Sequence, residues 1–151
     1  MDLEQLGDGG VEGLAVALAG YAADDTALGV DHLLPGAVFP AALLGEPFRF
    51  WGGYVGDELV SVAAALVCED LVDVSFVATQ PHARRRGYGA AVTWTATLCE
   101  PGLAAVLEAS DDGRQVYERM GYREVGRMTL WERPRDPAHP VYSPYSGMPQ
   151  S

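Results

Sequence analysis

The segment Thr79-Gln80-Pro81-His82-Ala83-Arg84-Arg85-Arg86-Gly87-Tyr88-Gly89-Ala90 runs from a strand-like stretch directly into a helix-like one. Its glycines allow the backbone to turn its amides inward and to approach a ligand closely. The start of the helix adds unpaired N–H groups and about half a positive charge, an arrangement that binds phosphate. The three arginines add charge and paired hydrogen-bond donors. The segment therefore predicts a phosphate-binding turn.

Upstream of this turn the sequence predicts an antiparallel meander. Residues 48–55 are rich in aromatic side chains, the turn signal Gly56-Asp57-Glu58 follows, and residues 59–68 are β-branched and alanine-rich, which predicts a hairpin. Residues 71–79 are the expected third strand. Alternation along a strand places successive side chains on opposite faces of the sheet. One face is predicted to carry Val72, Val74, Phe76 and Ala78. The other face, which has the polar groups, is predicted to carry Asp73, Ser75, Val77 and Thr79.

Downstream of the turn the sequence predicts alternating helices and strands. Residues 90–100 have helical apolar spacing and end at Pro101-Gly102, and residues 103–109 form a buried type of strand. Asp112 and Gln115 resemble a capping box that opens a helix through Met120. Gly121 is a good left-handed stop before a last strand over residues 122–132.

The two ends of the chain give weaker signals. Residues 11–23 predict an amphipathic helix, and residues 24–47 are interrupted by Gly and Pro, which leaves room only for a short helical turn at 41–44. No strand is expected before Val11. Residues 134–151 are rich in Pro and Ser and predict a tail without a core, so residues 1–133 are expected to form one domain.

Composition limits the classes of function. With 151 residues, 48% hydrophobic, the chain is expected to be a single soluble domain without a membrane span. Its formal charge is −11 and it has no lysine, which disfavours nucleic-acid binding. An acidic protein with one basic segment is expected to bind one anionic ligand. Cys68 and Cys99 in apolar stretches, with no secretory pattern after Met1, predict a reduced, cytoplasmic protein.

Two motifs together resemble the GCN5-related N-acetyltransferase (GNAT) superfamily. Arg84-x-x-Gly87-x-Gly89 after a meander strand is similar to the pyrophosphate loop of that superfamily. Residues 110–122 are similar to its second signature, Asn-x-x-Ala-x-x-Leu-Tyr-x-x-x-Gly-Phe, with Val116, Tyr117, Gly121 and Tyr122 in register. The match covers residues 48–133. It implies an α/β fold with a mixed, mostly antiparallel sheet flanked by helices.

The resemblance also implies a co-substrate, acetyl-CoA. Backbone amides from Arg85 to Ala90 would hold its pyrophosphate, and the main chain of residues 77–79 would pair with its pantetheine arm like an added strand. Residues 71–79 and 103–109 would splay into a V around the thioester. The implied cofactor-binding residues are Val77, Ala78, Thr79, Arg84, Arg85, Arg86, Gly87, Tyr88, Gly89, Ala90 and Ser110. No metal is expected, since His32, His82 and His139 have no metal-site spacing.

The implied reaction is direct attack of an amine on the thioester. Tyr117 matches the general acid of the superfamily, although it could instead pack beside Val116 and Met120. Asp73 and Glu108 are the candidates for the base that removes a proton from the ammonium. The acceptor, a small-molecule or peptide amine, is not identified. Four aromatic residues either line its pocket or pack in the core: Phe39, Phe50, Trp51 and Tyr54.

Departures from the superfamily pattern keep alternatives open. Ser110 stands where Asn is common and Gly113 where Ala is common, and the usual N-terminal strand is not evident. The acceptor half would then be shortened or completed by another subunit, as in a homodimer. A non-catalytic acyl-CoA-binding sensor or degenerate tandem half is the main alternative. A dinucleotide-binding unit, with Glu108 as its acidic residue, is disfavoured by Val92 and by the hairpin-linked strands.

Overall fold

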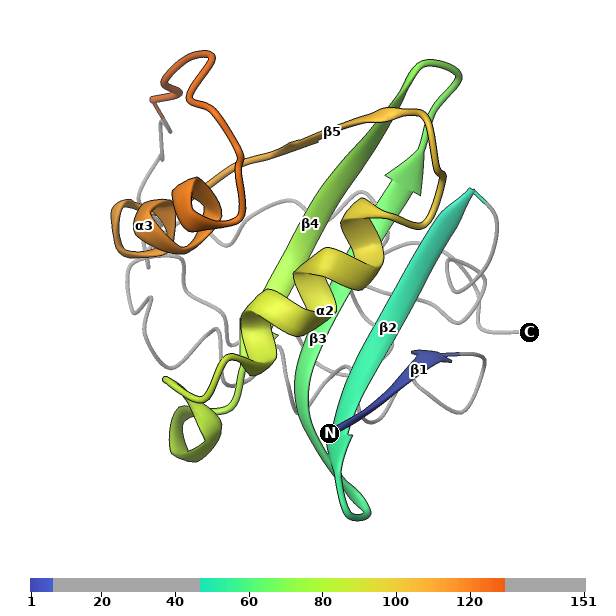
Figure 1. Cartoon of the computed structure of the whole chain (residues 1–151), viewed down its shortest axis with the longest axis vertical. Coiled ribbons are helices and arrows are strands. Elements are labelled where there is room, and N and C mark those ends of the chain that lie inside the picture. The colour runs from blue at the N-terminus through green and yellow to red at the C-terminus, as the bar shows by residue number, and fades with distance from the viewer. Residues whose placement is uncertain (7–46, 130–151) are drawn as a thin grey trace, which may run out of the picture.

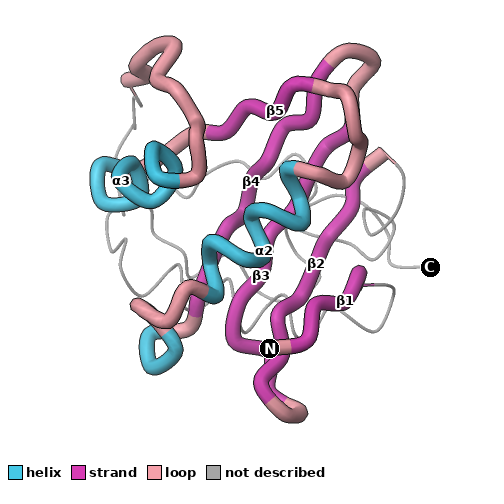
Figure 2. The backbone as a smooth tube through the Cα atoms, viewed as in Figure 1, coloured by secondary structure: helices cyan, strands magenta, loops and turns pink. Residues whose placement is uncertain are grey.

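The computed structural model describes residues 1–6 and 47–129, which form one five-stranded sheet with a helix across it (Figure 1). The strand order is β1-β2-β3-β4-β5. The first four strands pair antiparallel, and β5 runs parallel to β4 (Figure 2). The predicted mixed, mostly antiparallel α/β fold is confirmed. The strands are β1 (Asp2–Leu6), β2 (Phe48–Val55), β3 (Glu58–Val67), β4 (Leu71–Thr79) and β5 (Ala104–Leu107).

The predicted meander is confirmed from β2 to β4. β2 and β4 have the expected bounds, and β3 begins at Glu58, within the expected turn. Antiparallel pairing of these three strands contradicts the dinucleotide-binding alternative, which needs crossover helices between parallel strands. The buried Val92 packs in the core, where that motif needs a small residue.

The predicted alternation along β4 is wrong beyond Ser75. Phe76 has a φ of 51°, and the β3–β4 register shifts between Val62 and Ala64. Such a bulge places two successive residues on one face. Phe76 and Ala78 therefore do not share a face with Val72 and Val74: Phe76 contacts the ring of Phe50, and Ala78 joins the same cluster.

Two apolar clusters form the core on the two faces of the sheet. The helix-side cluster consists of Trp51, Ala63, Ala65, Val72, Val74, Val92 and Ala96. The opposite-face cluster consists of Leu6, Phe50, Leu59, Val62, Ala64 and Ala78. Of the two roles predicted for these aromatic residues, pocket lining or core packing, Phe50 and Trp51 have the second. Tyr54 packs against the opposite-face cluster.

The helices lie close to their predicted places. α2 (Tyr88–Thr97) begins two residues before and ends three before the predicted bounds, and the 3₁₀ turn η3 (Pro81–Ala83) precedes it. α3 (Asp111–Arg119) is capped by Ser110, whose hydroxyl accepts a bond of 3.1 Å from the Gly113 amide. The predicted capping box at Asp112 is therefore wrong. Gly121, with φ 91°, is the expected left-handed stop.

The predictions for the two ends of the domain were wrong. β1 forms where no strand was expected, and pairs with β2 from Asp2 opposite Tyr54 to Leu6 opposite Phe50. Of its five residues only Leu6 is buried, so its apolar pattern was too short to detect. Residues 122–129, predicted as strand, have no regular secondary structure. Val125 is 96% exposed, and none of the strands within residues 1–6 and 47–129 covers it.

Several predictions lie outside the described residues. These are the helix at 11–23, the turn at 41–44, Phe39, residues 130–132 of the last strand and the tail at 134–151. None of the helices within 1–6 and 47–129 has the length and apolar character needed to cross a membrane.

Candidate functional site

The predicted phosphate-binding turn lies at the junction of β4 and α2. Gly87 is the N-cap of α2 with φ 86°, and Arg85 also has a positive φ of 63°. The first bond inside the helix runs from the Ala91 amide to the Gly87 carbonyl at 3.0 Å. The amides of Tyr88, Gly89 and Ala90 precede that bond and are directed out of the helix end. No acidic residue lies in this first turn.

The backbone at Gly89 is close to the end of β4. A Cβ atom built there would lie 3.0 Å from Oγ1 of Thr79. This hydroxyl is held by Oγ of Ser61 at 2.8 Å, so it has little freedom to move away. A side chain at position 89 would therefore crowd the end of β4. The turn fits a pyrophosphate, which needs close approach of the backbone and several converging N–H donors.

The three arginines of the turn are not equivalent. Nε of Arg84 donates to the Thr79 carbonyl at 3.1 Å, so this partly buried side chain fastens the loop to the strand it leaves. Arg85 and Arg86 are exposed. Nε2 of the exposed His82 lies 3.1 Å from Oε1 of Glu58. Arg84 therefore shapes the loop, whereas the side chains of Arg85 and Arg86 extend to the surface.

Half of β4 has no partner on its β5 side within the described part of the chain. The parallel pairing extends only from Leu71 opposite Ala104 to Val74 opposite Leu107, although β4 continues to Thr79. Beyond Val74, β5 diverges from β4 and leads into α3 (Figure 1). Residues 77–79, predicted to pair with a pantetheine arm, lie on this open edge. A strand edge of this kind accepts an extended ligand by main-chain hydrogen bonds.

A pocket of about 800 Å³ lies between α2, β5 and α3. Tyr117, Glu108 and Ser110 all line it, so the structure brings these three predicted site residues together. Tyr117 is half-buried and Glu108 is exposed. The Ser110 hydroxyl accepts a hydrogen bond from the Gly113 amide as a helix cap, a structural role that the sequence did not predict.

Asp73 lies elsewhere, on the sheet beside the point of divergence. It pairs with Leu66 of β3 and Val106 of β5 and is half-buried. Ser75 follows two residues later, opposite Ala64 of the opposite-face cluster. Its Oγ is buried and has no hydrogen-bond partner among the described residues. The sequence did not single out Ser75, because nothing local shows that a strand hydroxyl is left unpaired.

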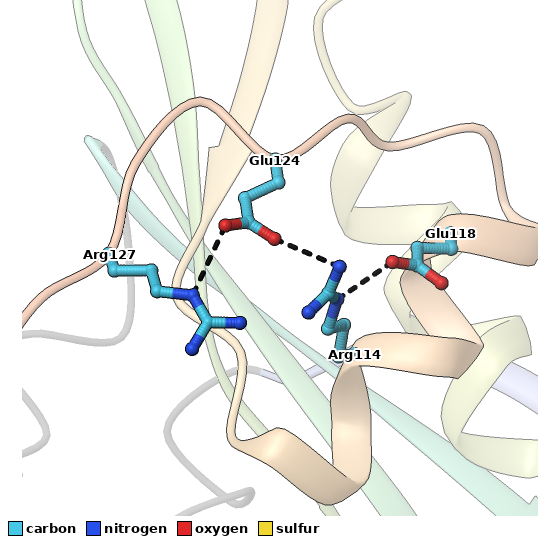
Figure 3. A network of polar contacts seen from close by, with 4 residues as sticks. All are labelled: Arg114, Glu118, Glu124 and Arg127. Carbon is cyan, nitrogen blue, oxygen red and sulfur yellow. Dashed lines mark hydrogen bonds and ion pairs between the residues drawn. The ribbon is translucent and has the colours of Figure 1, made fainter.

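Residues 122–129 are fastened to α3 by charged side chains (Figure 3). Arg114 binds Oε1 of Glu118 at 2.8 Å and Oε2 of Glu124 at 3.0 Å, and Arg127 binds Oε1 of Glu124 at 3.3 Å. Hydrogen bonding to Glu118 raises the pKa of Arg114. All four side chains are exposed, so each pair contributes little stability. The network sets the position of the outer wall of the pocket.

Comparison with solved structures assigns the fold. A predicted acetyltransferase with acetyl-CoA from Clostridium acetobutylicum aligns with a TM-score of 0.67 at 14% identity, over 87% of this chain and 95% of the other. The ribosomal-protein-alanine N-acetyltransferase of Brucella melitensis biovar Abortus 2308 gives 0.66 at 18%, over 88% and 99%. A GCN5-related N-acetyltransferase from Ralstonia eutropha JMP134 gives 0.62 at 20%, over 87% and 97%.

This chain has the GNAT fold. No protein-family model matches its sequence, and no curated protein does either. The resemblance found in the sequence is therefore carried by two short motifs, while the structural match extends over almost the whole domain. The N-terminal strand that GNAT proteins usually have is present as β1. Its presence removes one motive for the sensor alternative, which rested partly on a missing strand.

Proposed function

We propose that this protein is an N-acetyltransferase that moves an acetyl group from acetyl-CoA to the amine of a small molecule or peptide. The supporting observation is the continuity of the open half of β4 with the phosphate-binding turn. A CoA thioester consists of a pyrophosphate, an extended amide-containing arm and a reactive end. These parts match, in order, the amides of residues 88–90, the main chain of 77–79, and the point where β5 diverges.

The cofactor would be bound mainly by backbone groups. Amides at the start of α2, together with Arg85 and Arg86, would neutralise the pyrophosphate in a protein whose total charge of −11 repels anions. Arg84 would act indirectly, by keeping the loop against Thr79. Strand-like pairing along residues 77–79 would extend the arm toward β5.

In the proposed reaction the amine nitrogen forms a bond to the thioester carbonyl carbon and the carbon–sulfur bond breaks. A base first takes one proton from the ammonium to give the attacking amine. Tyr117 gives a proton to the departing sulfur and is restored by the second proton, which the nitrogen loses as the amide forms. Tyr117 lines the pocket next to β5, which suits this second step. Asp73 and Glu108 remain the candidates for the base. Glu108 shares the pocket with Tyr117, whereas Asp73 is less exposed and lies beside the open edge of β4.

Titration calorimetry with acetyl-CoA, with NAD as a parallel ligand, tests the binding half of the proposal. We expect acetyl-CoA alone to bind, and Gly89→Val to abolish that binding, because the new side chain would crowd the end of β4 beside the phosphate-binding turn. Circular dichroism of the variant controls for folding. Retained affinity in a folded Gly89→Val protein, or binding of NAD, would contradict the assignment of the loop.

Release of free thiol from acetyl-CoA with a panel of amines tests the catalytic half. Steady release above the rate in water supports an enzyme. Binding without any release across small-molecule and peptide amines would favour the non-catalytic sensor. Asp73→Asn and Glu108→Gln then separate the two candidate bases, since only loss of the true base should lower the rate at neutral pH.

The free thiols of Cys68 and Cys99 support our proposal that the protein works in the cytoplasm.

A further inference from the structure

The end of α3 folds back so that Tyr122 returns to the side of Tyr117. The Tyr122 amide donates to the Tyr117 carbonyl at 3.0 Å, and the Gly121 amide donates to the Glu118 carbonyl at 3.0 Å. With Gly121 in the left-handed region, this is a Schellman motif, which closes the helix and brings the following residue against its last turn. The two tyrosine rings then meet edge to face, with their centroids 6.1 Å apart.

The phenol of Tyr122 is fixed by α2. Its oxygen lies 2.6 Å from Oγ1 of Thr97. Thr97 has one hydroxyl proton and donates it to the Thr93 carbonyl at 2.7 Å. Tyr122 must therefore donate to Thr97, so its phenol must remain protonated. Burial raises the pKa of Tyr122, which is consistent with this donor role.

One side of the Tyr117 ring contacts Tyr122, and another side lies close to Gly113 of its own helix. A Cβ atom at Gly113 would lie 3.2 Å from Cε2 of Tyr117. The ring of Tyr117 thus occupies a slot between the backbone at Gly113 and the ring of Tyr122. Thr97, Tyr117 and Tyr122 all line the same pocket. The orientation of Tyr117 consequently depends on a contact made by the other helix, α2.

We propose that Tyr122 is a positioning residue for Tyr117, and that its hydrogen bond to Thr97 sets the orientation of the Tyr117 ring in the pocket. The inference deepens the proposed function, on which the chemical role of Tyr117 rests. The hydroxyl is the deciding group, because a phenylalanine at position 122 would keep the ring contact and lose the attachment to α2. With this positioning role, Tyr122 would affect turnover without contacting the reacting atoms.

Two variants remove the attachment, Tyr122→Phe and Thr97→Val. Thr95→Val is the matched control, because Thr95 also donates to a carbonyl four residues earlier, at Ala91, and lies on the same helix. The first readout is the NMR spectrum of protein labelled with ¹³C in its tyrosine rings, with Tyr117→Phe used to assign the Tyr117 signals. We expect Tyr122→Phe and Thr97→Val to shift or broaden these signals, and Thr95→Val to leave them in place.

The second readout is steady-state kinetics, which shows whether a variant changes kcat or KM. We expect both attachment variants to lower kcat about three- to ten-fold with the KM for acetyl-CoA unchanged, and to have no further effect in a Tyr117→Phe background. Unchanged Tyr117 signals in both variants, or an equal loss of kcat without Tyr117, would overturn the proposal. If the signals move but the parent protein transfers acetyl to no amine, the positioning contact stands and the proposed function fails.

Discussion

Single residues at this site carry roles that their neighbours in the sequence do not share. Arg84 is bonded to the carbonyl of Thr79, while Arg85 has a left-handed backbone and an exposed side chain. Ser75 and Phe76 show the same contrast, since one has a buried, unpaired hydroxyl and the other an exposed ring on a bulged backbone. At this scale the identity of a residue predicts its chemistry, and its contacts decide whether that chemistry is used.

Replacing Tyr117 with Phe should lower kcat and leave the affinity for acetyl-CoA almost unchanged. In the proposed reaction the hydroxyl acts only when sulfur leaves, and loss of a general acid typically costs about 10²- to 10⁴-fold in rate. Steady-state thiol release and calorimetry on the same preparation measure both quantities. An unchanged kcat would remove Tyr117 from the mechanism and leave it a packing residue.

Replacing Ser75 with Ala should stabilise the unliganded protein, by roughly 1 kcal/mol. A buried hydroxyl without a partner carries a desolvation cost of about 1–3 kcal/mol, and the methyl group of alanine carries none. Urea denaturation of the two proteins gives the difference. Thr93→Ala is the comparison, because that buried hydroxyl donates to the Gly89 carbonyl at 2.7 Å and its loss should destabilise.

The elements place these residues by how they begin, end and diverge. α2 begins after the left-handed Gly87, which follows β4 by way of the 3₁₀ turn η3, and its first amides are directed out of the helix end. β5 pairs with only the first half of β4 and so leaves the second half open. α3 ends in a Schellman motif that returns the chain to its own last turn. The candidate site therefore lies where α2 begins, where β5 leaves β4 and where α3 ends.

Replacing Gly121 with Ala should destabilise the fold by about 1–2 kcal/mol. A Cβ atom at Gly121 meets nothing within 4 Å, so the cost arises only from the left-handed backbone, at φ 91°. Gly126→Ala is the control, because Gly126 has neither a positive φ nor a neighbour within 4 Å. Thermal unfolding that shows equal stability for the two variants would contradict the assigned C-terminal motif.

On the scale of the whole molecule, an apolar cluster lies on each face of the sheet, and β1 is the edge strand on one side. Leu6 is 6% exposed and packs in the opposite-face cluster, whereas Leu3 of the same strand is 43% exposed. β1 therefore joins the domain through one buried side chain and its main-chain pairing with β2.

Replacing Leu6 with Ala should reduce the free energy of unfolding by about 2–4 kcal/mol, the usual cost of a truncated core leucine. Leu3→Ala should change it by no more than about 0.5 kcal/mol, as is usual at surface positions. Chemical denaturation of both variants measures the difference. Equal, small effects would mean that β1 is not part of the core.

The sequence alone was sufficient for the features that depend on neighbouring residues. The meander, the turn between β4 and α2 and the stop at Gly121 follow from local strand, glycine and helix signals, and the GNAT motifs lie within continuous segments. These are short-range features, because turn geometry and helix capping involve residues only a few positions apart. The sequence accordingly predicted the loop and the helix on which the candidate site is proposed.

Only the tertiary structure decided the features that depend on distant partners. β1 is a strand because β2 pairs with it across more than forty residues of sequence, and residues 122–129 are not a strand because no described segment pairs with them. The bulge at Phe76 moved the side chains that follow it in β4 to the opposite faces of the sheet. The bond from Tyr122 to Thr97 attaches the end of α3 to α2. Such contacts stabilise an element only when its partner is already in place, and no local pattern records them.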